Sequence, residues 1–300
     1  VTQEKRGMFK HWNVALIILT FCLVIFGTFL TRSGLLSSVH SFSESEIGPA
    51  FLAFIAVMFL ASLGLLLWRW SDLSSPYQIP SLFSREAAFL INNLLFMAIF
   101  LICLTGILFP ILSELLTGQK VTVGPPFYEH ATGPLFALLL LLMGIVPLTI
   151  WGSTTARSLG KGLWKPALLA LLAPLLSFIL GGNRWTALLS VWLIAFVILA
   201  TLMDTIRSVK IRARTHQESG WRAFSLLVQH NRRRYGGYLI HIGVALMGLG
   251  IIGIEFFQTT TQGMIAAGES LTLSNYTFTY EKLDIADTPD GRNSAVATVL

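Results

Sequence analysis

Residues 12–31, WNVALIILTFCLVIFGTFLT, contain no charged side chain, and as one helix they are long enough to cross a hydrocarbon core, which takes roughly 20 apolar residues. The rest of the chain has the same character: 54% of its 300 residues are hydrophobic and only 12% are charged. The mean hydropathy is +0.70. Since about a quarter of the residues in a soluble globular domain are charged, we predict an integral membrane protein.

Seven apolar runs of this kind predict an all-α polytopic membrane protein with about seven transmembrane helices. The runs lie at about residues 12–31, 48–68, 88–108, 133–151, 165–181, 184–203 and 236–254. The fifth and sixth are separated only by Gly181-Gly182-Asn183, and Pro174 falls within the fifth. Two full crossings are the favoured interpretation of this pair, and one re-entrant hairpin is the alternative.

The distribution of basic residues predicts how these helices are oriented. Lys and Arg are enriched in the cytoplasmic loops of membrane proteins. Sixteen of the 21 lysines and arginines lie on one side of the seven predicted spans, which is also the side of the N-terminus. We therefore expect a cytoplasmic N-terminus and an external C-terminus, and we interpret the net charge of +6 as an orientation signal, not as a nucleic-acid-binding surface.

The pattern changes after Ile254 to short segments typical of strands. These are Leu271–Tyr280 and Ala295–Leu300, separated by the turn Pro289-Asp290-Gly291. We therefore divide the chain into a transmembrane helical bundle, residues 1–254, and the start of a small external β-rich domain, residues 255–300. Because the chain begins without Met and stops within a predicted strand, we expect it to be a fragment of a longer protein.

His241 is the first candidate functional residue, because it lies inside the last predicted span. An ionisable side chain within the membrane is costly and suggests a function. Gly237, Ala245 and Gly248 share its helical face at i−4, i+4 and i+7, which leaves room for another helix or a flat macrocycle. An axial haem ligand needs that clearance and a neutral imidazole nitrogen. The alternative is a histidine hydrogen-bonded to a neighbouring helix.

His40 and Arg32 are the second candidate, because both lie just outside the first span, in the segment Thr28-Phe-Leu-Thr-Arg-Ser-Gly-Leu-Leu-Ser-Ser-Val-His-Ser-Phe42. The apolar residues between Leu35 and Phe42 recur at helix-like spacing, which suggests a short interfacial helix. A histidine can ligate haem iron, and an arginine suits a propionate carboxylate.

Other motifs lack the context that their usual functions require. The GxGxxG pattern Gly248–Gly253 follows no strand, so helix packing by small residues explains it better than dinucleotide binding. The two cysteines lie in separate apolar runs, and we find no zinc-ligand spacing, P-loop or Ser/His/Asp arrangement. Three of the remaining histidines fall in cytoplasmic basic segments, and we interpret His130, in an external loop, as a solvated side chain without an assigned role.

Three stretches together resemble the CcmF family of cytochrome c biogenesis proteins. The first is Glu4-Lys-Arg-Gly followed by Gly27-Thr-Phe-Leu-Thr-Arg-Ser-Gly-Leu-Leu-Ser-Ser-Val-His-Ser-Phe42, which is highly specific. The second is Ser84-Arg-Glu with Asn92-Asn93, Pro110 and Val123-Gly-Pro-Pro126, and the third is His241-Ile-Gly-Val-Ala245 before an external β domain. The resemblance extends over essentially the whole chain and corresponds to the C-terminal half of the family's members.

The resemblance implies a haem-binding membrane subunit of the lyase that matures cytochrome c at the bacterial inner membrane. Haem from the chaperone CcmE would be held at the periplasmic surface, with His40 as one axial ligand of its iron. A resident transmembrane haem b would have His241 as an axial ligand. The tryptophan-rich segment and the other histidine ligands of the family would precede Val1, so the lyase would be incomplete in this fragment. A role for Arg32 in binding a propionate is our own inference.

The implied function is attachment of haem to the thiols of a CxxCH motif in apocytochrome c. The implied partners are CcmE, a CcmH-type thiol-handling subunit, apocytochrome c and the lipid bilayer. Two alternatives remain: an NrfE-type lyase subunit, which serves CxxCK cytochromes, and a multi-span transporter. The spans contain no Asp/Glu/His relay and no inverted repeat, which disfavours the transporter.

Overall fold

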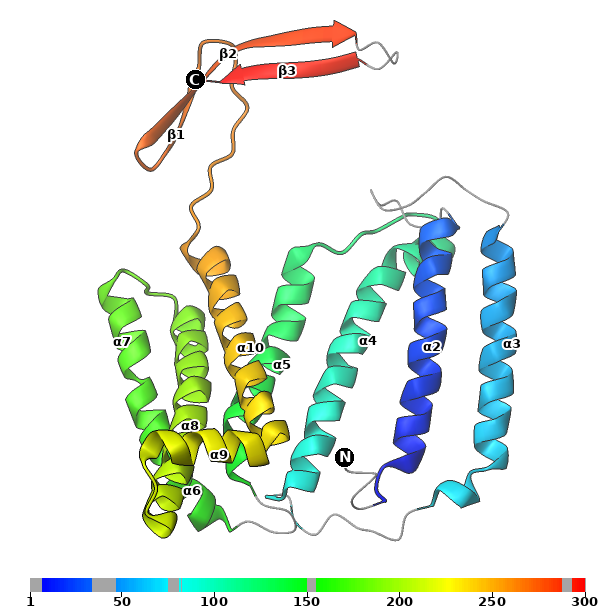
Figure 1. Cartoon of the computed structure of the whole chain (residues 1–300). Helices are drawn as coiled ribbons and strands as arrows, with labels where there is room; N and C mark the ends of the chain where they lie inside the picture. Colours follow the sequence, from blue (N-terminus) through cyan, green and yellow to red (C-terminus); the bar gives the residue numbers. More distant parts are fainter. Residues whose placement is uncertain are drawn as a thin grey trace. The chain divides into compact units, whose positions relative to one another are not determined.

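The computed structural model describes residues 7–33, 47–74, 81, 83–149, 155–287 and 293–299, and these are helical apart from a small C-terminal sheet (Figure 1). The helices are α2 (Lys10–Arg32), α3 (Ile47–Trp68), α4 (Arg85–Thr117), α5 (Pro125–Ile145), α6 (Ala156–Ala170), α7 (Leu172–Ile179), α8 (Trp185–His216), α9 (Gly220–His230) and α10 (Arg232–Phe257). Short 3-10 turns, η1 (Ser71–Leu73) and η2 (Val146–Leu148), follow α3 and α5.

Seven helical segments in this described part are long and apolar enough to cross a membrane, which agrees with the predicted number. α6 and α7 together form one of these segments, residues 156–179. Helices satisfy their own backbone hydrogen bonds, which is the requirement that hydrocarbon imposes on a spanning segment. Which side of the membrane each end faces is not decided by these helices, so the orientation stays a prediction.

The chain forms two compact units, residues 1–165 and 166–300. In the first unit α2 packs on α3 and α4 packs on α5. Gly106 of α4 allows a close approach to α5: a Cβ atom there would fall 2.6 Å from the ring carbon Cζ of Tyr128. The predicted boundary at Ile254, between a helical bundle and a β domain, falls inside the second unit. It stays a prediction.

The Ser84-Arg-Glu motif begins α4 and has a structural explanation. The Ser84 hydroxyl accepts a hydrogen bond from the backbone N–H of Ala87 at 3.1 Å, so it is an N-cap. Arg85 donates to the backbone carbonyl of Thr149 at 2.7 Å and thereby ties the start of α4 to the end of η2. Glu86 is fully buried, in the first turn of α4, where a carboxylate interacts favourably with the helix dipole.

In the second unit α8 is the central helix, since α7, α9 and α10 all pack against it. It is also the most buried span. Of an apolar 18-residue stretch of α8, 39% is buried, compared with 17% or less of the equivalent stretch in each of the other candidate spans. The indole N–H of Trp192 donates to the carbonyl of Ala167 at 3.0 Å, which joins α8 to the end of α6. This packing positions the site described below.

The C-terminal sheet is antiparallel in the order β1 (Ser270–Leu273), β2 (Tyr276–Asp287), β3 (Asn293–Val299). The predicted strand-like segment Leu271–Tyr280 is a hairpin instead of one strand. Leu273 pairs with Tyr276, and Ser274 adopts the left-handed conformation at φ 54°. Both turn residues are polar, and the apolar positions shift from Leu271 and Leu273 to Tyr276, Phe278 and Tyr280, so the change of phase in the alternation marks the turn.

Candidate functional site

His241 lies in α10, on the side of the helix that packs against α8. Two contacts define how these helices align: Asp204 of α8 binds Tyr238, and Ile194 of α8 lies 3.4 Å from the Cβ position of Gly248. Residue numbers fall along α8 as they rise along α10, so the helices are antiparallel. By this alignment His241 lies level with Thr201, which is 1% exposed and whose hydroxyl donates to the carbonyl of Val197 at 2.8 Å.

The imidazole of His241 is half-buried, and its Nδ1 atom is buried without a hydrogen-bond partner in the described part of the chain. A buried polar atom without a partner is rare, because its desolvation costs about 1–3 kcal/mol. The predicted alternative, a histidine satisfied by a neighbouring helix, therefore finds no support at this nitrogen. An imidazole with an unsatisfied nitrogen is able to coordinate iron or to bind an added group.

The surroundings of His241 leave space for such a group on one side. One turn towards the N-terminus of α10, a Cβ atom on Gly237 would meet no other atom within 4 Å in the described structure. One turn towards the C-terminus, Ala245 is fully buried and allows close packing. Small residues next to an unsatisfied imidazole fit an axial haem ligand, which needs clearance for the macrocycle. The residues present are therefore compatible with haem at this position.

A polar cluster joins α8 to α10 one to two helical turns before His241. It consists of Asp204, Arg234 and Tyr238, and we call it the α8–α10 cluster. One carboxylate oxygen of Asp204 accepts hydrogen bonds from Tyr238 Oη and from Arg234 Nη2, both at 2.6 Å. Arg234 Nε also donates to Tyr238 Oη at 2.9 Å. The Asp204 side chain is 12% exposed and that of Arg234 47% exposed, so the charge pair lies at the edge of the packed interface.

The cluster determines which face of α10 is turned to α8. Tyr238 and Arg234 precede His241 by three and seven residues, so all three lie along one side of α10. Sequence reasoning missed this cluster, since it counted Arg234 only as an orientation signal and assigned no role to Asp204 or Tyr238. The detectable signal was an acidic residue at the end of an apolar run, followed by an Arg and a Tyr spaced i, i+4 in the next span.

Asp204→Asn should destabilise the second unit. The substitution keeps the shape of the side chain but removes the charge that binds Arg234, so we expect a loss of about 1–2 kcal/mol, less than for a fully buried pair because Arg234 is partly exposed. The measurement is the melting temperature of the detergent-purified protein. Asp72→Asn is the matched control, because its pair with Arg69 is mostly exposed and should contribute little. Equal melting temperatures for both variants and the unmodified protein would contradict a stabilising role.

The second predicted site is only partly within the described residues. Arg32 is an exposed residue in the last turn of α2, where a cation interacts favourably with the helix dipole. His40 lies outside the described residues, as does the predicted interfacial helix around it. Arg32 belongs to the first unit and His241 to the second, so each candidate is described within its own unit.

Three other histidines in the described residues have local contacts that explain their positions. His130 and His230 are exposed, and each has Nδ1 within 2.8 Å of a backbone carbonyl four residues earlier in its own helix. His11, predicted to be solvated, has Nε2 2.8 Å from the carbonyl of Trp70 and packs against its indole ring. No group of three His, Cys, Asp or Glu side chains that could hold a metal ion occurs among the described residues.

Similar proteins support the resemblance that the motifs indicate, although the chain matches no family model. The cytochrome c-type biogenesis protein CcmF of Pseudomonas aeruginosa is 34% identical over 286 residues, which cover 93% of this chain and 41% of that protein. The probable cytochrome c-type biogenesis protein NrfE of Escherichia coli is 39% identical over 169 residues, which cover 56% of this chain and 29% of that protein.

A solved structure shows the same similarity in three dimensions. A structure described as the cytochrome c haem lyase CcmF aligns with 99% of this chain and 43% of its own, with a TM-score of 0.67 and 28% identity. The chain therefore spans about two fifths of the length of the CcmF proteins it matches.

Proposed function

We propose, from the premise that this chain is a homologue of the CcmF cytochrome c-type biogenesis proteins, that it is a haem-binding part of a haem lyase that matures cytochrome c. The observation that carries the proposal is the likeness, along almost the whole chain, to a solved structure described as a cytochrome c haem lyase. The unsatisfied imidazole of His241 is an independent observation in its favour.

His241 is the proposed axial ligand of a resident haem b. The antiparallel contact of α8 with α10 supports this role, because the α8–α10 cluster and the packing of Gly248 on Ile194 hold the helix on both sides of the imidazole. A haem bound there would supply a one-electron redox centre. The chain itself contributes a nitrogen that needs a partner and space beside Gly237.

His40 is the proposed axial ligand of a second haem, the one that is transferred to the cytochrome. Haem is here a substrate, received from its chaperone CcmE at the periplasmic surface. The proposed interfacial helix after α2 would hold His40 at the headgroup level, and Arg32 would bind a propionate. These roles rest on the family resemblance of the segment Gly27–Phe42 and on the position of Arg32 at the end of α2.

The proposed reaction joins haem to apocytochrome c through two thioethers. Each reduced thiol of a CxxCH motif adds across one haem vinyl group: a carbon–sulfur bond forms and the thiol hydrogen passes to the adjacent vinyl carbon, so no oxidant is required. The addition is the chemistry of the two substrates, and the protein supplies binding and orientation. A CcmH-type subunit that handles the apocytochrome thiols is the proposed further partner.

The proposed location is the bacterial inner membrane. The seven apolar helices support a multi-pass membrane protein. The excess of basic residues on the side of the N-terminus supports a cytoplasmic N-terminus and a periplasmic C-terminal sheet. Haem transfer would then take place on the periplasmic side, where α2 ends.

A second candidate function is that of an NrfE-type subunit, which would serve a cytochrome with a CxxCK motif. The observation in its favour is the higher identity, 39%, over the 169 residues shared with the NrfE protein. The two functions differ in the apocytochrome and not in the haem chemistry of this chain.

The test is cytochrome maturation in bacteria that lack their own lyase subunit. The natural gene product that contains this chain is expressed with the remaining maturation proteins and with reporter apocytochromes carrying CxxCH or CxxCK, and covalent haem is detected on a denaturing gel. We expect haem on the CxxCH reporter and none on a reporter whose two cysteines are alanine. Haem on the CxxCK reporter alone would establish the second candidate, and haem on neither would contradict both.

A further inference from the structure

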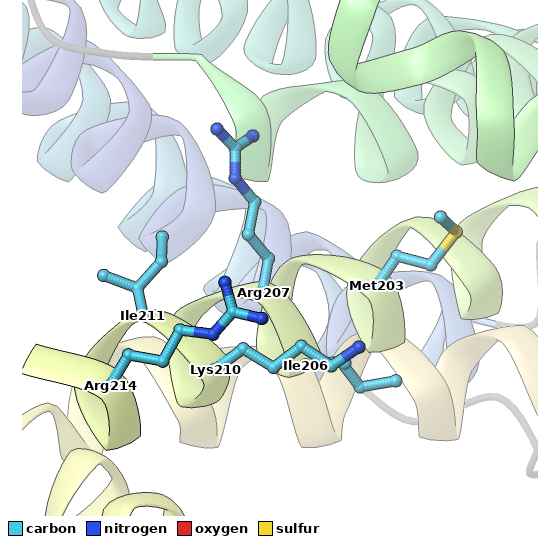
Figure 2. Close-up of a pocket in the computed structure, with 6 residues that line it drawn as sticks. All are labelled: Met203, Ile206, Arg207, Lys210, Ile211 and Arg214. Carbon is cyan, nitrogen blue, oxygen red and sulfur yellow. The ribbon is translucent and has the colours of Figure 1, made fainter. Parts of the chain in front are cut away.

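The second half of α8 carries a shallow, open hollow that the proposed function does not use. Six side chains of one stretch of this helix line a volume of about 480 Å³ (Figure 2). Three are basic and three are apolar: Arg207, Lys210, Arg214, Met203, Ile206 and Ile211. We call this feature the α8 basic groove.

The depth of the groove follows from the length of the apolar part of α8. A hydrocarbon core takes roughly 20 helical residues. Counted from Trp185, where α8 begins, that length ends near Asp204. Arg207 therefore comes about one turn after the hydrocarbon segment, at the level of the lipid headgroups, and Lys210 and Arg214 follow about one and two turns further out. Their long side chains tilt back towards the N-terminus of the helix, and so towards the headgroups. This placement holds for either orientation of the protein in the membrane.

The side chains along the groove change from apolar to basic, as a phospholipid changes from its acyl chains to its charged phosphate. Met203 and Ile206 come first, next to the hydrocarbon segment, and Ile206 is half exposed. Arg207, Lys210 and Arg214 follow at spacings of three and four residues, so they lie on one side of the helix. An acyl chain beside the apolar residues would bring its phosphate among the three cations.

The positive charge of the groove is not neutralised by the described part of the chain. Arg207, Lys210 and Arg214 are all exposed, and none forms an ion pair with another described residue. The acidic residues nearest in sequence are Asp204 on one side, already bound by Arg234 and Tyr238, and Glu218 on the other, already bound by Arg212. By contrast, Arg212, which does not line the groove, is paired with Glu218 at 3.1 Å. Three cations without counter-ions, the first of them at headgroup depth, are complementary to an anionic lipid.

We propose that the α8 basic groove binds an anionic phospholipid, with its phosphate held between Arg207, Lys210 and Arg214 and its acyl chain along Met203 and Ile206. This inference is independent of the proposed haem chemistry. A lipid bound there would cover an exposed side of α8, the helix that α10 packs against, and would thereby stabilise the second unit.

The test is lipid binding by the delipidated natural gene product that contains this chain, followed by native mass spectrometry during titration with phosphatidylglycerol or phosphatidylcholine. We expect selective retention of phosphatidylglycerol. The variant Arg207→Gln/Lys210→Gln/Arg214→Gln should bind it roughly 100-fold more weakly, since each cation near a membrane surface contributes severalfold to the binding of anionic lipids. Inorganic phosphate should not displace the lipid, because it has no acyl chain.

A matched triple variant controls for net charge. Arg222→Gln/Arg232→Gln/Arg233→Gln removes three exposed cations of the same unit that do not line the groove, and it should retain lipid binding. The conservative variant Arg207→Lys/Arg214→Lys should bind nearly as well as the unmodified protein. Equal loss in both triple variants, equal retention in both, or equal binding of phosphatidylcholine would overturn the proposal. Should the groove triple variant fail to fold, Lys210→Gln alone should still weaken phosphatidylglycerol binding severalfold, and unchanged binding would overturn the proposal in the same way.

Discussion

Replacing His241 with alanine is expected to remove the proposed resident haem b from the purified protein. The substitution deletes an imidazole whose Nδ1 has no other partner among the described residues, so it breaks no hydrogen bond of that nitrogen. The α8–α10 cluster and the contact of Gly248 with Ile194 are untouched, and the protein should remain folded. The measurement is the haem content per protein, which we expect to fall to a few per cent or less, since an axial ligand is lost.

His230→Ala is the matched control, because this histidine is exposed and lies near a carbonyl of its own helix. It should leave the haem content unchanged. Added imidazole should restore part of the haem to His241→Ala, because alanine leaves the volume of the deleted ring beside the open position of Gly237. A folded His241→Ala protein with its full haem content would show that another residue binds the iron.

Replacing His40 with alanine is expected to abolish cytochrome c maturation while the resident haem remains. The two proposed haem sites use different histidines, so loss of one should not empty the other. His40 belongs to the segment with the most specific family resemblance, and Arg32 is the last residue of α2, a candidate membrane span. The measurements are covalent haem on a CxxCH reporter cytochrome and the haem content of the purified protein.

Ser41→Ala changes the neighbouring position and should leave maturation close to normal. The charge-reversing variant Arg32→Glu should reduce maturation less than His40→Ala, because a propionate contact orients haem whereas an axial ligand holds the iron. Maturation that persists in His40→Ala would show that His40 is not a required ligand of the transferred haem. Loss of the resident haem in the same variant would show that the two sites are not separate.

The helical architecture could be predicted because lipid imposes a simple rule on sequence: each span needs a long run of apolar residues. The ends of the helices could not be predicted by that rule. α8 continues to His216, well beyond the predicted end of its span at residue 203, because the basic half is stabilised by packing against α9 and by the pair of Arg212 with Glu218. Such contacts are made with residues that follow α8, so they leave no mark in the hydropathy of α8 itself.

The candidate site was predictable only where one residue was unusual in its own segment. His241 stood out as an ionisable residue in an apolar run. The α8–α10 cluster did not, because Asp204 lies 30 and 34 residues from its two partners, and its carboxylate meets them only when α8 packs against α10. The Ser274–Asn275 turn did leave a local signal, because the apolar positions change phase between Leu273 and Tyr276, and the prediction of one segment Leu271–Tyr280 overlooked it.

The most direct measurement is the reduced absorption spectrum of the natural gene product that contains this chain, purified from bacteria that make haem. A bound, six-coordinate b-type haem that is present in the unmodified protein and in His230→Ala, and absent in His241→Ala, is the predicted result. A protein that carries no haem, and that instead mediates solute uptake when reconstituted in vesicles, would contradict the account and establish the transporter alternative.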